Sequence, residues 1–175
     1  MAPKIVVIED REDVVRVLKT YLEPEGFQVV AAATGEEGLR LVTREKPDVL
    51  ILDLVLPGLD GLEVCRRLRR DPETAQLPIL ILSGKGEATD RVTGLEVGAD
   101  DYVAKPFNAT EMVSRVKALL RRASGSHAVR MLREGSIELD IDRYTVSVEG
   151  RPVKLTAKEF DLLRALLEAK GRTLT

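Results

Sequence analysis

The chain has 175 residues, with 27 Lys or Arg against 29 Asp or Glu and a formal net charge of −2. Hydrophobic residues make up 44% of it, and no apolar run is long enough to span a membrane. This composition predicts a soluble, cytoplasmic protein without a membrane partner. It excludes a strongly basic nucleic-acid-binding surface, and the acidic run Glu9–Asp13 after the first short apolar stretch excludes a signal peptide. Cys65 is the only cysteine, so an internal disulfide is excluded too.

Up to about residue 122, segments typical of strands alternate with segments typical of helices. The strand-like runs cover residues 4–8, 27–32, 48–53, 78–82 and 100–104. The helix-like segments cover residues 12–23, 35–45, 60–70, 88–97 and 109–122, and the second, third and fifth begin with a capping residue: Thr34, Asp60 and Asn108. Such alternation predicts βαβ units. We therefore expect one α/β domain over residues 1–122, with a five-stranded parallel sheet in doubly wound order.

The pattern changes after residues 123–129, which are small and polar and are predicted to be a linker. In residues 136–140 and 144–148, apolar and polar residues alternate with period two, which favours half-buried antiparallel strands. These strands are expected at residues 136–140, 144–148 and 153–155. Thr156 and Glu159 then form a capping box that begins an amphipathic helix. Three short strands and one helix bury little surface, so this α+β unit is expected to be the first part of a larger domain.

Chemically active side chains follow the strand ends: Glu9 and Asp10, then Asp53, Ser83 and Lys105. The carboxyl ends of parallel strands meet at one edge of a sheet, so we expect these groups to lie together. Three carboxylates in one place repel each other, and their oxygens suit Mg²⁺. Asp53 can attack a phosphoryl donor to give an acyl phosphate, while Lys105 balances the charge. The sequence therefore predicts a site for Mg²⁺ and a phosphoryl group.

In this order, these residues resemble the receiver domains of bacterial two-component response regulators. The resemblance rests on Glu9-Asp10, Asp53 with Pro57-Gly58, Ser83, Tyr102 and Lys105-Pro106. It implies a CheY-like, flavodoxin-like fold in which Asp53 accepts a phosphoryl group from a sensor histidine kinase. It also implies that Glu9, Asp10, Asp53 and the backbone carbonyl of Val55 bind Mg²⁺. Tyr102 would turn inward when Ser83 moves, and the protein would be a signalling switch and not an enzyme.

Residues 87–122 are similar to one subfamily, the OmpR/PhoB type, whose members dimerise when phosphorylated. Under this resemblance the charges that carry the dimer contact are Arg91, Glu96, Asp100, Asp101, Glu111, Arg115 and Lys117. Residues 130–175 are similar to the start of the subfamily's winged-helix effector. The resemblance thus implies a homodimer, and DNA binding only where the effector continues beyond Thr175.

Two other classes of function are compatible with parts of the pattern. An aspartate-nucleophile phosphatase, or a hydrolase similar to haloacid dehalogenases, uses related metal and lysine chemistry. Those enzymes carry Asp-x-Asp at the end of the first strand, whereas Asp53 ends the third. The other class is a stand-alone receiver that serves as an interaction module and binds no DNA at any salt concentration.

Overall fold

The computed structural model describes residues 2–84, 98–123 and 131–169, and it separates into two compact units, Met1–Ser124 and Gly125–Thr175. Each unit is treated by itself. Within the described residues, no helix is both long enough and apolar enough to cross a membrane. The expected helix at residues 88–97 and the expected linker at 123–129 fall almost entirely outside the described residues.

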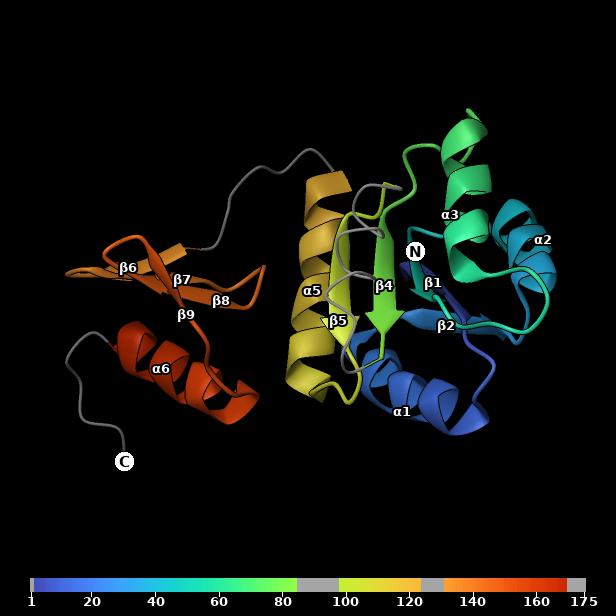
Figure 1. Ribbon diagram of the computed structural model, residues 1–175. Coiled ribbons are helices and arrows are strands. Elements are labelled where there is room, and N and C mark those ends of the chain that lie inside the picture. Colours follow the sequence, from blue (N-terminus) through green and yellow to red (C-terminus); the bar gives the residue numbers. More distant parts are fainter. Residues whose placement is uncertain (1, 85–97, 124–130, 170–175) are drawn as a thin grey trace. The chain divides into compact units, whose positions relative to one another are not determined.

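The first unit is a five-stranded parallel sheet with helices on both faces, as the sequence predicts (Figure 1). The sheet order β2-β1-β3-β4-β5 is that of a doubly wound, CheY-like receiver fold. Its strands are β1 (Lys4–Ile8), β2 (Gln28–Ala32), β3 (Val49–Asp53), β4 (Ile79–Ser83) and β5 (Asp101–Ala104). Its helices are α1 (Glu12–Leu22), the 3-10 turn η1 (Glu23–Glu25), α2 (Gly35–Glu45), α3 (Gly61–Arg70) and α5 (Ala109–Ala123). The strands after β1 begin one residue later than the patterns predicted.

Side chains on the two faces of the sheet form two separate apolar layers. On one face, Leu50 and Leu52 pack with Leu41 of α2 and with Val64 and Leu68 of α3. On the other face, α1 and α5 cover the sheet, with residues such as Leu18 and Val116 in the layer. Because successive strand side chains point to opposite faces, the continuous apolar run of β3 serves both layers. The sheet is thus held rigidly, and the loops at its carboxyl edge start from fixed positions.

The start of α3 is fixed close to the end of β3. Asp60 caps the helix, since its carboxylate accepts a hydrogen bond from the Glu63 amide at 2.8 Å. The next residue, Gly61, lies so close to β3 that a Cβ atom there would be 2.2 Å from the carbonyl oxygen of Asp53. Only glycine fits this approach without moving backbone atoms. The contact ties the loop after Asp53 to the helix that follows it.

The second unit is a four-stranded antiparallel sheet with one helix, which fits the start of a winged-helix effector. Its elements are β6 (Met131–Glu134), β7 (Ile137–Asp140), β8 (Thr145–Val148), β9 (Arg151–Val153) and α6 (Ala157–Ala169). Two details of the prediction were wrong. β6 was missed, and the last strand lies at Arg151–Val153 and not at residues 153–155. Glu149 and Gly150, both with positive φ, make a tight two-residue turn, so pairing with β8 resumes at once.

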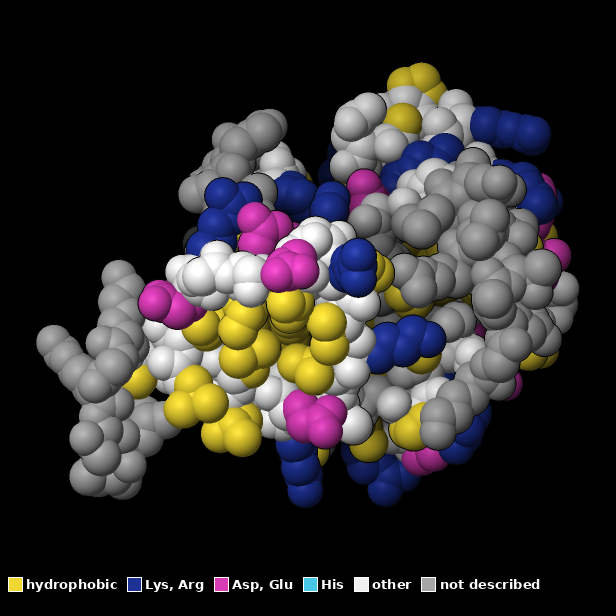
Figure 2. Space-filling model, turned by 60° about the vertical axis from the view of Figure 1, so that its left-hand side comes forward, with side chains coloured by type: hydrophobic (Ala, Val, Ile, Leu, Met, Phe, Trp, Pro, Cys, Tyr) yellow, Lys and Arg dark blue, Asp and Glu magenta, His cyan; other side chains and the backbone are white. Residues whose placement is uncertain are grey.

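Phe160 of α6 holds the small core of this unit together. It is 1% exposed, and its ring stacks on that of Tyr144 with the centroids 3.7 Å apart. Tyr144 has a positive φ of 57°, and its hydroxyl donates a hydrogen bond to Asp161 of the same helix. Hydrophobic side chains gather on the face turned to the viewer in Figure 2, and those exposed on α6 include Leu162 and Leu166.

Replacing Gly61 by alanine should destabilise the first unit by about 1–3 kcal/mol, because the new methyl group meets backbone atoms that cannot rotate away. Denaturant unfolding of the first unit measures this change. Gly84→Ala is the matched control, since nothing lies within 4 Å of its Cβ position. Equal stability of the two variants would contradict the close approach.

Replacing Phe160 by alanine should cost the second unit about 3–5 kcal/mol, which exceeds what so small a core can lose. We expect proteases to cut residues 131–169 rapidly in this variant while residues 2–84 stay protected. Limited proteolysis followed by mass spectrometry makes the comparison. Leu162→Ala, at a position 60% exposed, should leave the cleavage rate unchanged.

Candidate functional site

Three carboxylates converge at the carboxyl edge of the parallel sheet. Oxygen atoms of Glu9, Asp10 and Asp53 all lie within 4.8 Å of one another. Glu9 and Asp53 are buried, at 1% and 4% exposure, whereas Asp10 is exposed. Glu9 directly follows β1 and Asp53 is the last residue of β3, and these two strands are paired neighbours in the sheet. These carboxylate oxygens are the kind of donors that a hard cation such as Mg²⁺ prefers.

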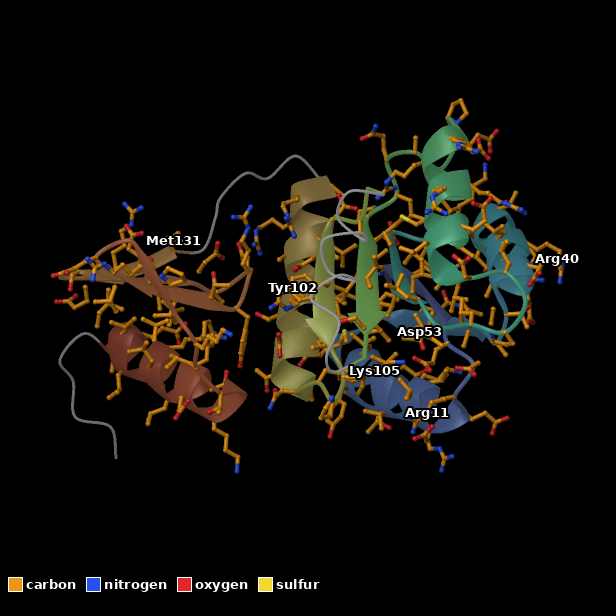
Figure 3. All side chains as sticks on the ribbon, in the orientation of Figure 1. Arg11, Arg40, Asp53, Tyr102, Lys105 and Met131 are labelled. Carbon is orange, nitrogen blue, oxygen red and sulfur yellow. The ribbon has the colours of Figure 1, made fainter. Side chains whose placement is uncertain are left out.

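Lys105 contacts both buried acids, and Figure 3 shows it beside Asp53. Its ammonium nitrogen is 2.6 Å from Oε2 of Glu9 and 2.7 Å from Oδ2 of Asp53. The other oxygen of Asp53 accepts a hydrogen bond from the Val55 amide at 3.3 Å, which brings the backbone of that residue into the site. The Lys105–Pro106 peptide is cis, as the resemblance implies.

The pKa values of Glu9 and Lys105 both shift upward, for different reasons. Burial raises the pKa of Glu9 most, and the charge of Asp53 raises it further, against the lowering effect of the hydrogen bond from Lys105. Burial acts most strongly and lowers the pKa of Lys105, but the hydrogen bonds to Asp53 and Glu9 and the charges of these two acids together raise it above its usual value. The lysine therefore carries a positive charge at neutral pH. Keeping Glu9 ionised lowers the stability of the folded chain, because its pKa is raised there.

Ser83 ends β4, and the backbone places it one residue beyond the partner of Asp53. Its carbonyl oxygen accepts a hydrogen bond from the Lys105 amide at 2.6 Å. Gly84 leaves open space beside it. Tyr102 of β5 is half-buried and lies two residues before Ala104, the partner of Ser83, so Tyr102 and Ser83 share one face of the sheet. Tyr102 lies earlier in β5 than Lys105, which follows the strand, and Figure 3 shows it apart from Asp53 and Lys105.

The charges predicted for a dimer contact have internal partners wherever the structure describes them. Arg115 is buried and bonds to Asp101 at 3.0 Å and to Glu111 at 2.9 Å. Burial acts to lower the pKa of Arg115, but the two acids raise it above its usual value. Lys117 and Asp100 pair with residues that the sequence did not suggest. Arg91 and Glu96 lie outside the described residues.

Those unsuspected partners are Glu25 and Arg69. Lys117 contacts Glu25 of η1, and Asp100 contacts Arg69 of α3. Arg69 stands in the arginine-rich end of α3, yet its side chain is only 19% exposed, so it is not simply a solvated charge. No local pattern could reveal either pair, since the partners lie far apart in sequence. Cys65 is buried in the core of the first unit, and its burial raises the pKa of the thiol.

Comparison with known proteins identifies the family to which the chain belongs. The family model for the response regulator receiver domain matches residues 5–117. The phosphate regulon transcriptional regulatory protein PhoB of Rhizobium meliloti is 47% identical over 175 residues, covering 100% of this chain and 77% of that protein. The alkaline phosphatase synthesis transcriptional regulatory protein PhoP of Bacillus subtilis is 45% identical over 184 residues, covering 100% of this chain and 76% of that protein.

Solved structures agree on the fold. The receiver domain of the Francisella response regulator 1452 superposes with a TM-score of 0.64 at 33% identity, covering 69% of this chain and 98% of that one. The BeF3-activated receiver domain of RstA from Klebsiella pneumoniae gives a TM-score of 0.63 at 35% identity, covering 67% and 98%. Both likenesses extend over about the length of the first unit.

Removing the charge of Glu9 should stabilise the protein at neutral pH when divalent cations are chelated. The folded chain holds the Glu9 proton more tightly than the unfolded chain does, because its pKa is raised. The contribution of this tighter proton binding to the free energy of unfolding is complete below pH 4.5, and it is lost as the pH rises through the pKa of Glu9 in the folded chain. We therefore expect Glu9→Gln to unfold at higher denaturant than the wild type at pH 7, with the gap closing toward pH 4.5. Glu12→Gln, at an exposed position in the first turn of α1, is the control. A less stable Glu9→Gln at pH 7 would contradict this account.

Proposed function

The chain belongs to the OmpR/PhoB-type response regulators, and from this premise we propose that it is a switch activated by phosphorylation of Asp53. The phosphoryl group comes from a sensor histidine kinase and is accepted with Mg²⁺ bound. Phosphorylation drives homodimerisation, and in a regulator with a complete effector it drives DNA binding and control of transcription.

A single contact carries the proposal: the Lys105 ammonium bonds Asp53 and Glu9 together, next to Asp10. A lysine fixed on the acceptor carboxylate can neutralise a phosphoryl oxygen once the group is attached. An acid that only capped a helix would need neither this lysine nor two further carboxylates. Asp53 is the acceptor because it is bonded by Lys105 on one oxygen and by the Val55 amide on the other, which fixes its orientation.

The residues that would hold Mg²⁺ are Glu9, Asp10, Asp53 and the backbone carbonyl of Val55. The donor set fits, because Mg²⁺ prefers oxygen ligands and usually keeps several waters, for which the exposed Asp10 leaves room. When bound, the ion supplies positive charge that stabilises the phosphoryl oxygens during transfer. The protein's own part is to hold the carboxylates within reach of one another, which the pairing of β1 with β3 accomplishes.

The transfer itself needs little covalent chemistry from the protein. An oxygen of Asp53 forms a bond to phosphorus as the phosphorus–nitrogen bond of the donor phosphohistidine breaks, and the leaving imidazole takes up a proton from water. The ammonium group of Lys105, which neutralises Asp53 before the transfer, then neutralises the phosphoryl oxygens as well. The Ser83 hydroxyl, on the neighbouring strand, donates a hydrogen bond to one of those oxygens.

The output of the switch follows from the face that Ser83 and Tyr102 share. A phosphoryl group adds about −1.5 to −2 charge, which draws Ser83 toward Asp53 and leaves room for Tyr102 to turn inward. The change alters the surface that carries the proposed dimer charges. The second unit, proposed as residues 130–175 after a linker at 123–129, begins the DNA-binding effector. DNA recognition is proposed for a longer regulator that continues beyond Thr175, since this chain matches 77% of the length of its PhoB relative.

Incubating the chain with acetyl phosphate and Mg²⁺ should add one phosphoryl group, and Asp53→Asn should abolish the addition, because the amide is a poor nucleophile. Intact-mass spectrometry measures this directly. Asp48→Asn is the matched control. It removes an exposed carboxylate near the start of the same strand and should keep full uptake.

Two results would count against the assignment. Uptake of phosphate by Asp53→Asn at the wild-type rate would place the acceptor elsewhere. Absence of any adduct on the wild type with Mg²⁺ present would favour an interaction module that works without phosphorylation.

A further inference from the structure

The charges proposed for the dimer contact fall into two groups by the location of their internal partners. Asp101, Glu111 and Arg115 pair among themselves. Asp100 and Lys117 instead pair with residues outside the set, Arg69 and Glu25. We call Arg69 and Glu25 the outside partners. An association that uses Asp100 or Lys117 must compete with them.

Arg69 is fixed so firmly that it cannot follow Asp100 into a new contact. Its Nε donates to the Gly98 carbonyl at 2.7 Å, and its Nη1 donates to the carbonyls of Ala75 and Leu77 at 3.0 and 2.7 Å. The remaining nitrogen, Nη2, donates to Asp100 at 2.8 Å. Three backbone carbonyls therefore hold the guanidinium in place, and its charge is presented permanently to Asp100.

Asp100 is only partly enclosed by this arrangement. The oxygen that Arg69 contacts also accepts a hydrogen bond from the Ile79 amide at 2.8 Å. The side chain is nevertheless 43% exposed, so a second chain can reach it. Its negative charge, however, is already neutralised at short range, and a cation from outside gains less from approaching it.

Glu25 acts on Lys117 in a simpler way. The ammonium of Lys117 is 2.5 Å from a carboxylate oxygen of Glu25, and both side chains are nearly half exposed. Lys117 lies two residues after Arg115, about 200° around the helix. Glu25 on η1 thus draws the lysine toward that turn, away from the side of α5 that carries Arg115. Lys117 must leave Glu25 before it can join contacts on the Arg115 side.

We propose that Arg69 and Glu25 are autoinhibitory partners, which hold Asp100 and Lys117 in intramolecular ion pairs and so weaken association between two chains. The inference rests on the proposed function, since it assigns a control to the proposed dimerisation. Its consequence is that charge-removing changes at two positions outside the contact strengthen the dimer.

The test is the dimer dissociation constant of the 175-residue chain, measured by sedimentation with acetyl phosphate and Mg²⁺ and also without them. Glu25→Gln and Arg69→Ala should each lower the constant about 2- to 30-fold, because one exposed ion pair changes an equilibrium by up to about fivefold and a symmetric dimer contains the pair twice. Glu25→Gln removes only an exposed surface charge, so it keeps the test valid if Arg69→Ala does not fold.

Matched controls separate a specific release from a change in net charge. Glu23→Gln alters an exposed acid on the same 3-10 turn, and Arg70→Ala alters an exposed arginine at the next position of α3. Both should leave the constant unchanged. In a Lys117→Gln background, Glu25→Gln should have no further effect, and in an Asp100→Asn background the same holds for Arg69→Ala.

The inference is overturned if Glu25→Gln and Arg69→Ala match their controls, or if the tighter association persists in the Lys117→Gln and Asp100→Asn backgrounds. A wild-type chain that takes up phosphate yet stays monomeric at every concentration overturns both the inference and the dimer step of the proposed function. A chain that takes up no phosphate contradicts the proposed function alone, and the order of dissociation constants without phosphate then decides the inference.

Discussion

The ammonium of Lys105 lies between two buried carboxylates, and the carboxyl edge of the sheet depends on this contact. Glu9 and Asp53 are almost fully enclosed, so their charges repel each other with little screening by water. The apolar layers on both faces of the sheet keep β1 and β3 from moving apart to relieve the repulsion. The negative charge must therefore be balanced at the site itself, by Lys105, which directly follows β5, and by the cation that we propose.

The proposed switch uses this balance. Phosphorylation of Asp53 would change the charge that Lys105 has to neutralise, at a point where β3, β4 and β5 run side by side. Lys105 is also bonded through its backbone amide to the carbonyl of Ser83, so the end of β4 and the end of β5 are coupled. A local electrostatic change is thereby converted into a change of surface. The outside partners Arg69 and Glu25 then set how readily that surface meets a second chain.

Much of the first unit could be predicted from sequence, because β1, β3 and β4 are apolar runs that a polar residue ends or directly follows. Glu9, Asp10, Asp53 and Lys105 come together as expected for the ends of parallel strands. The ion pairs of Arg69 and Glu25 could not be predicted, since their partners are 31 and 92 residues away and leave no periodic signal. β6 was missed because Met131–Glu134 does not alternate, although Gly135, with φ of 56°, marks the turn that follows it.

The most direct test of the central claim identifies the carboxylate that carries the phosphoryl group. The chain would be incubated with acetyl phosphate and Mg²⁺, reduced with borohydride, digested and sequenced by mass spectrometry. Reduction converts an aspartyl phosphate to homoserine and leaves free carboxylates intact. The account predicts homoserine at residue 53 and nowhere else. Homoserine at Asp10, reduction at Glu9, or an unmodified Asp53 in a chain that has gained phosphate would contradict it.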